Sequence, residues 1–517
     1  MSGLTDILGK LIGGLASKWD WLDGKLTEIA VNRLVTRVRS RPHPWSTLND
    51  YISWHGLTDR TYNARLLPAK PIADLPDINE VAALFAAGPV QRECPKSTCL
   101  FPAFAQYLTD GFLRTKLDNE RLAEDRRRTT SNHDIDLSPL YGRTRDQTIL
   151  LRSGVGGRLK SQMIGTEEFP PWLYLRGSPT VDPVFAALDK PLGIDHATDA
   201  QKQTLFAVGG DRANASPGVT MMNVLFLREH NRLAGQIALA KPGWGDDQLF
   251  EVTRNNIIVL FIKIVVEEYI NHISDAPFRL RADPRVAWKA KWNRPNWMTA
   301  EFSLLYRWHS LVPEAMRWGG QSVPGIATIL NNALLIRDGL ATSFAETSAN
   351  RATELGLGNT SAALMAIGIE QKAIQQGRDI DMPPYNDYRV AAGGKPAASF
   401  ANVTPDPALQ SRLAALYTTP DRIEFYVGLF AEPRAKNSPL PDLIKTLVAV
   451  DAFSQALTNP LLSEHIWGNN TNRLSAFTQI GLDNYFATSS LEDILKRNSA
   501  GLDGRFVGMT RQDWMRD

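Results

Sequence analysis

The chain contains only two cysteines, Cys94 and Cys99, among its 517 residues. So few thiols exclude a framework of structural disulfides and favour a reducing compartment. The two cysteines flank a turn-like PKST stretch, where a local disulfide and two unpaired buried thiols are both compatible with the sequence. Two thiols alone do not make a structural zinc site, which needs four ligands.

The sequence also has little net charge. Lys and Arg total 57 against 55 Asp and Glu, which gives a formal net charge of +2 at pH 7. A chain so evenly balanced has no basic field that would attract nucleic acid. Because its composition, 43% hydrophobic and 22% charged, is ordinary for a soluble globular protein, we expect a cytoplasmic protein without a nucleic-acid partner.

Long hydrophobic runs are absent as well. No stretch approaches the roughly 18 to 20 apolar residues that a membrane-spanning helix needs, and the N-terminus lacks the basic start and continuous apolar core of a signal peptide. The first 50 residues do carry a helical apolar stripe with nearby tryptophans: Leu4, Ile7, Leu8, Leu11, Ile12, Leu15, Trp19 and Trp21. Such a stripe either packs on the protein body or lies on a membrane surface. We therefore separate an N-terminal amphipathic segment, residues 1–50, from one large domain, residues 51–517.

Helical periodicity is what the sequence has in abundance. Residues 252–274 predict a long, mostly buried helix, and residues 218–239 predict another, which follows the helix-breaking pair Pro217 and Gly218. Strand-like alternation is scarce, and the loops rich in Pro and Gly near 168–193 and 378–408 do not read as flexible interdomain linkers. The sequence thus predicts a mainly α fold, a large single helical domain with few short strands.

Tyr306 and His309 stand three residues apart in EFSLLYRWHSLVP, a stretch that otherwise has the pattern of a buried helix. Residues at i and i+3 of a helix share a face, so we expect the phenol to lie beside whatever the imidazole binds. A lone histidine on an apolar helix is most often a satisfied core residue. An imidazole next to a redox-active phenol also suits a heme iron whose oxidised state takes an electron from the tyrosine.

Three further stretches carry polar residues, and each of them has both a structural and a functional interpretation. In LFPAFAQYLTDGFLRTK, Gln106 and Asp110 share a predicted helix face, either as a polar edge or as site residues. In VGGDRANASPG, Arg212 fits a loop salt bridge or a charged site. The stretch TSNHDIDLSPLYG suits a hard cation such as calcium or a turn whose side chains bond backbone amides. Its alternating oxygen-bearing residues are Asn132, Asp134, Asp136 and Ser138.

Taken in this order, these stretches resemble the peroxidase–cyclooxygenase superfamily of heme enzymes, which includes the mammalian peroxidases, the cyclooxygenases and the fatty-acid dioxygenases. The resemblance runs from about LTDRTYNARLLP (57–68) to near residue 470. The stretches closest to the cyclooxygenase and fatty-acid dioxygenase side are LREHNRLA, IKIVVEEYINHIS, EFSLLYRWHSLVPE and IEFYVGLFAEP. The resemblance implies that residues 51–517 form a catalytic heme-peroxidase domain that binds heme b.

The same resemblance assigns roles to residues. It makes His309 the ligand of the heme iron and Tyr306 the tyrosine that becomes a radical and removes hydrogen from a fatty acid. Gln106 takes the place of the distal glutamine, and Arg212 that of the distal arginine of the mammalian peroxidases. Asp421 takes the place of the residue that orients the proximal imidazole. Asp136 and Ser138 fall at calcium-ligand positions, preceded by Asp134 and Asn132.

Three departures from the family pattern change what is expected. Asp110 stands where the family has its distal histidine, and an aspartate can carry the same proton if burial raises its pKa towards neutrality. Thr109 and Ala215 stand at the acidic positions that attach heme covalently in the mammalian peroxidases, so the resemblance implies noncovalent heme. Gly111 replaces a further calcium ligand, which weakens the expectation of calcium.

The resemblance therefore implies a heme-dependent oxidoreductase with three readings. The first is a fatty-acid dioxygenase that uses dioxygen and a tyrosyl radical, with Ser454 near the serine of the oxygenase channel. The second is a peroxidase that reduces hydrogen peroxide with small organic donors. The third, from a different class, is a heme- or lipid-binding protein without turnover.

Overall fold

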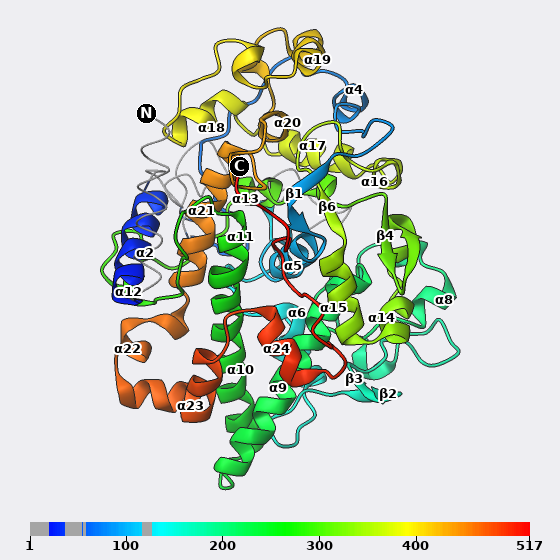
Figure 1. The fold of residues 1–517 in the computed structure, drawn as a ribbon, viewed down its shortest axis with the longest axis vertical. Coiled ribbons are helices and arrows are strands. Elements are labelled where there is room, and N and C mark those ends of the chain that lie inside the picture. Colours follow the sequence, from blue (N-terminus) through cyan, green and yellow to red (C-terminus); the bar gives the residue numbers. More distant parts are fainter. Residues whose placement is uncertain (1–19, 37–53, 55–57, 116–126) are drawn as a thin grey trace.

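The structure is a computed structural model that describes residues 20–36, 54, 58–115 and 127–517. The N-terminal stripe from Leu4 to Leu15 and Trp19 lies outside the described residues. About half of the described chain is helical, and the strands are few and short (Figure 1). The prediction of a mainly α fold with few short strands is confirmed.

The helices of the first half of the chain, which include all of the longest buried ones, are α2 (Asp20–Val35), α4 (Ile78–Ala82), α5 (Leu100–Asp110), α6 (Ser138–Tyr141), α7 (Arg145–Leu151), α8 (Asp199–Lys202), α9 (Pro217–Ala240) and α10 (Asp246–Ile264). Those of the second half are α11 (Asn271–Ile273), α12 (Arg285–Trp288), α13 (Ala300–Leu305), α14 (Ala333–Asp338), α15 (Leu340–Ala349), α16 (Ala362–Ala366), α17 (Ile369–Asp379), α18 (Tyr385–Ala391), α19 (Pro407–Tyr417), α20 (Phe425–Ala431), α21 (Asp442–Leu457), α22 (Glu464–Trp467), α23 (Asn470–Phe486) and α24 (Leu491–Asn498).

The strands form three separate antiparallel pairs in the described chain. β2 (Gln162–Ile164) pairs with β3 (Glu167–Phe169), and β4 (Ala315–Trp318) pairs with β5 (Gln321–Pro324). β1 (Glu93–Thr98) pairs with β6 (Arg351–Thr353), which lies far along the chain. The C-terminal tail runs beside β1, where the amide of Thr98 donates to the carbonyl of Met509 at 2.9 Å (Figure 1). These contacts close the fold around the start of α5.

Helices α9 and α10 are the two longest helices of the described chain and carry a large part of the buried core. Pro217 starts α9, where a missing amide proton costs nothing, and nearly every residue from Val219 to Leu233 is buried. α10 packs on α9 and α23, and α5 packs on α9 (Figure 1). α13 contacts both α20 and α21, and α17 contacts α20. The core therefore holds α5, α17 and α20, which carry Asp110, Glu370 and Tyr426 of the candidate site, and α13, which leads directly to Tyr306.

Two sequence predictions about helices are confirmed with one refinement. The helix predicted at 218–239 is α9, and the one predicted at 252–274 is a continuous helical run. Within that run, Val265–Ile270 form a π-helical segment between α10 and α11. Such segments occur often at functional sites, because the extra residue rotates the side chains that follow.

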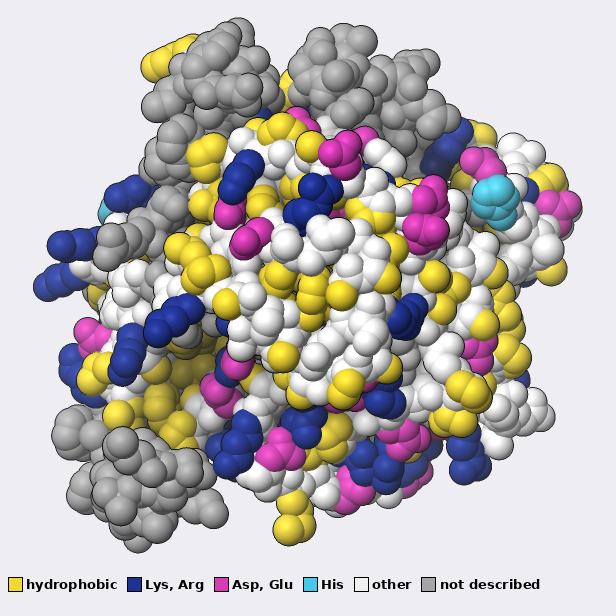
Figure 2. Space-filling view, turned by 90° about the horizontal axis from the view of Figure 1, so that it is seen from above, with side chains coloured by type: hydrophobic (Ala, Val, Ile, Leu, Met, Phe, Trp, Pro, Cys, Tyr) yellow, Lys and Arg dark blue, Asp and Glu magenta, His cyan; other side chains and the backbone are white. Residues whose placement is uncertain are grey.

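Both cysteines are free and buried, which decides between the two readings of the sequence. The thiol of Cys94 contacts the hydroxyl of Ser97 at 3.3 Å, and that of Cys99 contacts the carbonyl of Arg351 at 3.3 Å. Among the described residues, no helix is both long and apolar enough to cross a membrane. Figure 2 shows acidic and basic side chains interspersed over one face of the molecule, as the small net charge predicts.

Candidate active site

Tyr306 and His309 do not share a continuous helix, so that prediction is wrong. α13 ends at Leu305, and Tyr306 has left helical geometry with φ −96° and ψ 18°. The indole of Trp308 stacks on the Tyr306 ring, with centroids 4.6 Å apart and planes 21° from parallel. Residues two apart on a helix do not face each other, so this stack requires the break. Tertiary packing of the aromatic side chains therefore overrides the helical pattern here.

His309 is the first residue of a short 3₁₀ turn, His309–Leu311, and its ring is held by a carboxylate. The ring contacts the carboxylate of Glu370 in α17, with Nδ1 and Oε1 3.1 Å apart. An imidazole that donates its Nδ1 proton to a carboxylate leaves Nε2 as the metal-binding nitrogen. The chemistry and orientation of these groups fit a heme iron.

The predicted partner of the imidazole, Asp421, is wrong. The carboxylate of Asp421 accepts a hydrogen bond from the side-chain amide of Asn386 at 2.6 Å, and the hydrogen bond of His309 goes to Glu370. Glu370 also accepts from the hydroxyls of Tyr426 at 2.7 Å and Thr360 at 2.9 Å. Burial raises the pKa of Glu370, but His309 and the two hydroxyls more than offset it, and the net shift is downward.

Tyr306 is held by a second tyrosine. The hydroxyl of Tyr269, in the π-helical segment, donates to the Tyr306 hydroxyl at 3.2 Å. Phe302 packs against the Tyr306 ring at 4.7 Å between centroids. Burial raises the pKa of Tyr306, and the hydrogen bond from Tyr269 opposes that rise. The phenol is therefore protonated and fixed in orientation.

Asp110, the last residue of α5, is 1% exposed. The Arg212 guanidinium reaches it at 4.0 Å, so the structure brings together two residues that the sequence places 102 positions apart. Gly210 makes this approach achievable, because a Cβ at that position would lie 2.0 Å from Oδ2 of Asp110. Gln106, one turn earlier on α5, is exposed. Of the distal residues predicted from the sequence, Asp110 and Arg212 are therefore brought together, and Gln106 is not buried with them.

A second carboxyl group, Asp211, lies beside Asp110. Burial raises the pKa of Asp110 to about 7, Asp211 adds to the rise, and Arg114 and Arg212 oppose it. Burial raises the pKa of Asp211, but the charges of Arg212 and Arg114 more than offset it and hold that pKa low. Of the two acids, Asp110 therefore takes up a proton near neutral pH, and Asp211 stays ionised.

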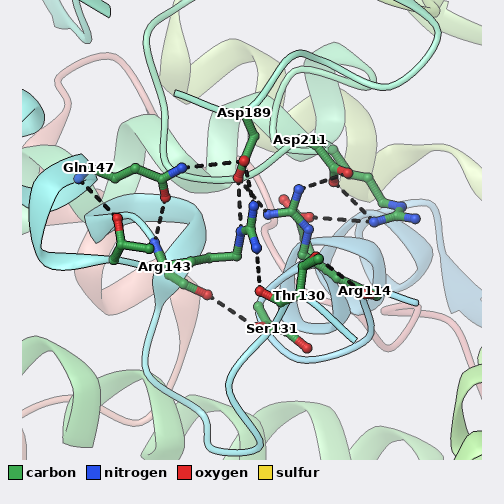
Figure 3. A network of polar contacts seen from close by, with 12 residues as sticks. Arg114, Thr130, Ser131, Arg143, Gln147, Asp189 and Asp211 are labelled. Atoms are coloured by element: carbon green, nitrogen blue, oxygen red, sulfur yellow. Dashed lines mark hydrogen bonds and ion pairs between the residues drawn. The ribbon is translucent and has the colours of Figure 1, made fainter. Parts of the chain in front are cut away.

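The charge on Asp211 is anchored by a network of arginines (Figure 3). Arg114 lies between two carboxylates, 3.0 Å from Asp189 and 2.7 Å from Asp211. Arg143 binds the same carboxylate, with its Nε 2.9 Å from Oδ2, the oxygen that Arg114 also contacts. Arg212 pairs with Asp211 at 3.0 Å, so the salt bridge expected from the sequence also exists. Because these charges are buried and paired, the network fixes the loop that carries Arg212.

The candidate calcium segment is closed by its own hydrogen bonds. The side-chain amide of Asn132 donates to Oδ2 of Asp136 at 2.6 Å, and the amide of Ser138 donates to Oδ1 at 2.8 Å. The Ser138 hydroxyl donates to the carbonyl of Gly111 at 3.1 Å. Burial raises the pKa of Asp134, and the described part of the chain holds no cluster of three metal-binding side chains. As arranged, these residues do not fit a calcium ion, and calcium binding stays an untested prediction.

We expect chelation with EDTA to leave the melting temperature unchanged. The change Asp136→Ala should instead destabilise the fold by about 1 to 3 kcal/mol, since it leaves the Ser138 amide without its acceptor. Asp136→Asn, which keeps one acceptor oxygen, is the matched control and should cost less. A fall in melting temperature on chelation, reversed by added calcium, would show that the ion is bound after all.

Ser454, the candidate channel residue, is buried in α21 and bonds back to its own helix. Its hydroxyl donates to the carbonyls of Val450 at 2.7 Å and Asp451 at 2.8 Å. A cavity of about 200 Å³ lies between α13, α17 and α20, and Leu304 and Tyr426 are among its lining residues. It is smaller than the roughly 300 Å³ at which ligand pockets begin. This cavity therefore does not suit a long-chain substrate.

Sequence reasoning missed four residues of this site. Tyr269 and Tyr426 fall within stretches that carry the family resemblance, and this position in the sequence is the signal that marks them. Asp211 directly precedes Arg212, so it too lies in a stretch that the sequence analysis had already singled out. Glu370 lies in GIEQKAIQQ, which resembles an ordinary amphipathic helix and carries no signal.

The helical fold, and a histidine whose ring is held by the carboxylate of Glu370, are what a heme-dependent oxidoreductase of the peroxidase type requires. The sequence profile described as animal haem peroxidase matches residues 93–507, and the chain belongs to this family. It is 29% identical over 472 residues to prostaglandin G/H synthase 1 of Rattus norvegicus, which covers 88% of this chain and 75% of that protein. Prostaglandin G/H synthase 2 of Mus musculus is 30% identical, with 83% and 70% covered.

Solved structures with the same fold include two enzymes. The fatty acid alpha-dioxygenase of Oryza sativa has a TM-score of 0.70 at 16% identity, covering 98% of this chain and 97% of that one. Peroxidase A of Dictyostelium discoideum has a TM-score of 0.69 at 20% identity, covering 87% and 96%. At these identities the structures establish the fold. The placement on the cyclooxygenase side of the family rests on the prostaglandin synthases.

Proposed function

We propose that this protein is a fatty-acid dioxygenase that binds heme b noncovalently through His309. One observation carries the proposal: Tyr306, three residues before His309, is a half-buried phenol oriented by Tyr269 and stacked on Trp308. A peroxidase acting on small donors does not need such a phenol. A variant of the rice alpha-dioxygenase was solved with palmitic acid, and the fatty-acid substrate proposed here follows that relative.

Heme held by His309 would supply a one-electron oxidant in the presence of a hydroperoxide. Tyr306 would give one electron to that oxidant and its phenolic proton to the reduced peroxide oxygen, which leaves as water, and would become a neutral radical. The radical takes a hydrogen atom from a C–H bond of the fatty acid, and dioxygen adds to the carbon radical. The resulting peroxyl radical takes a hydrogen atom from Tyr306, which completes the lipid hydroperoxide and restores the tyrosyl radical.

Before this cycle, Asp110 transfers a proton of the hydroperoxide, and Arg212 assists by stabilising charge. Asp110 as a carboxylate accepts the proton of the hydroperoxide and returns it to the departing oxygen, and Arg212 stabilises the negative charge that develops there. Gln106 is the residue we place beside them on the distal side. Thr109 and Ala215 offer no carboxylate for a covalent bond to heme.

A specific observation keeps a peroxidase function as the second candidate. The pKa of Asp110 near 7 is well matched to acid–base catalysis at neutral pH, so the distal side alone supports peroxide reduction. Small organic donors would then replace the fatty acid. A heme-binding role without turnover is the least favoured, because the phenol, the ligand and the distal acid are all present.

The test is oxygen uptake by the heme-loaded protein with a panel of saturated and unsaturated fatty acids, primed with hydrogen peroxide. We expect a Soret band that responds to peroxide and oxygen consumption that requires the lipid. His309→Ala is the control and should lose the Soret band. A peroxide response without oxygen uptake would favour the peroxidase, and a protein that takes up no heme would overturn both functions.

We also propose peripheral membrane contact through the N-terminal segment, residues 1–50. Two large apolar side chains are exposed, Ile29 within this segment at 64% and Trp54 just after it at 76%. Exposed apolar side chains of this kind suit the edge of a bilayer, as does the apolar pattern of the first residues in the sequence. Sedimentation with anionic and neutral lipid vesicles, comparing the full chain with Trp54→Ser, tests this contact.

The change Asp211→Asn should shift the pH dependence of the reaction with peroxide. A base must be ionised to accept a proton, so the wild-type rate should rise with pH through about 7, the pKa of Asp110. Removing the neighbouring negative charge while Arg114 and Arg212 remain should lower that pKa, so the midpoint moves to lower pH. Stopped-flow measurement of the Soret change between pH 4 and 9 gives both midpoints. Equal midpoints would show that Asp211 does not tune Asp110.

A further inference from the structure

We propose that Glu370 is a positioning residue that accepts the Nδ1 proton of His309 as a carboxylate and thereby lowers the reduction potential of heme iron bound at Nε2. This inference rests on the proposed heme function and goes beyond it, because it assigns the tuning of the metal to a residue 61 positions after the ligand. A carboxylate partner increases the electron donation of an imidazole to its metal and so favours the more highly charged ferric state.

The position of Glu370 suits a permanent negative charge. It is 1% exposed and lies in the first turn of α17, whose N-terminus stabilises an anion. Three donors surround its two oxygens: His309 and Thr360 at Oε1, and Tyr426 at Oε2. The buried guanidinium of Arg307 also acts on it electrostatically. A buried carboxylate with this many partners remains ionised and fixed in place.

The hydroxyls of Thr360 and Tyr426 determine how strongly the Glu370 carboxylate accepts the hydrogen bond from the imidazole. A hydrogen bond from Tyr426 or Thr360 draws negative charge away from the oxygen that faces His309. Removing either donor should therefore strengthen the effect of Glu370, and neutralising Glu370 should weaken it. The two kinds of change act in opposite directions, which a merely structural support of His309 does not predict.

The experiment measures the ferric/ferrous midpoint potential of the heme-loaded protein by spectroelectrochemistry, without any substrate turnover. We expect Glu370→Gln to raise the midpoint and Tyr426→Phe and Thr360→Val to lower it, relative to wild type. Glu370→Asp keeps the charge and should lie between wild type and Glu370→Gln. The Fe–Nε2 stretching frequency of the ferrous protein should fall in Glu370→Gln and rise in Tyr426→Phe.

Tyr417→Phe is the matched control, because Tyr417 donates to another buried carboxylate, Glu424, at the same 2.7 Å and does not contact His309. It should leave the midpoint unchanged. Shifts of the same sign in Glu370→Gln and Tyr426→Phe, or no shift in either, would overturn the inference. Should Glu370→Gln fail to fold, Tyr426→Phe and Thr360→Val still decide it. A wild-type protein that binds no heme would instead overturn the proposed function, so the two failures are distinguishable.

Discussion

Replacing Tyr306 with phenylalanine should reduce fatty-acid oxygen uptake to the level of the heme-free protein. Phenylalanine has no O–H bond to give up, so no radical that can take hydrogen from a lipid forms at this position. The aromatic contacts of the site should survive, because Trp308 and Phe302 touch the ring and the hydroxyl contributes only the bond from Tyr269. Losing that bond costs on the order of 1 kcal/mol, which leaves the fold intact.

Oxygen uptake, the Soret spectrum and oxidation of a small donor should be measured on the same Tyr306→Phe preparation. Donor oxidation should persist, since it needs His309 and the distal residues and not the phenol. Tyr269→Phe is the matched control: it removes the same hydrogen bond and keeps the Tyr306 phenol, so oxygenation should fall only in part. Lipid oxygenation that persists in Tyr306→Phe would rule out the tyrosyl mechanism.

The second large effect concerns Asp110. Asp110→Ala should slow the reaction of the heme protein with hydrogen peroxide by about 10²- to 10⁴-fold, the usual contribution of a positioned acid–base group. The pH dependence near 7 should disappear in this variant, because the titrating carboxyl is gone. Rapid-mixing spectroscopy of the Soret band at several pH values provides both quantities.

Two further variants sharpen the test of Asp110. Asp110→Asn preserves the size of the side chain and removes the base, so it should be about as slow as Asp110→Ala. Asp110→His introduces the residue that the family resemblance places here, and it should recover part of the rate. If all three variants reacted with peroxide as fast as wild type, the proton would be carried by another group, and the distal side would need a new assignment.

Much of this protein was determined by its sequence alone. The long apolar periodicities at 218–239 and 252–274 specify helices α9 and α10, because a helix that is apolar around most of its surface can only be buried. Tyr306, His309 and Asp110 also followed from short stretches in a fixed order, since each stretch is local in the chain. Local patterns of this kind can be recognised without knowing which other parts of the chain pack against them.

The tertiary structure decided what holds these residues. The helix ends before Tyr306 because its ring stacks on Trp308, and nothing in the local pattern encodes that preference. Glu370 became the partner of His309 because α17 places its carboxylate 3.1 Å from the ring, whereas the expected Asp421 bonds Asn386 of α18. Contacts between residues 60 or more positions apart depend on the packing of whole helices. The sequence therefore indicated several candidate residues of the site, and the three-dimensional packing added Glu370 and the other partners that orient and charge them.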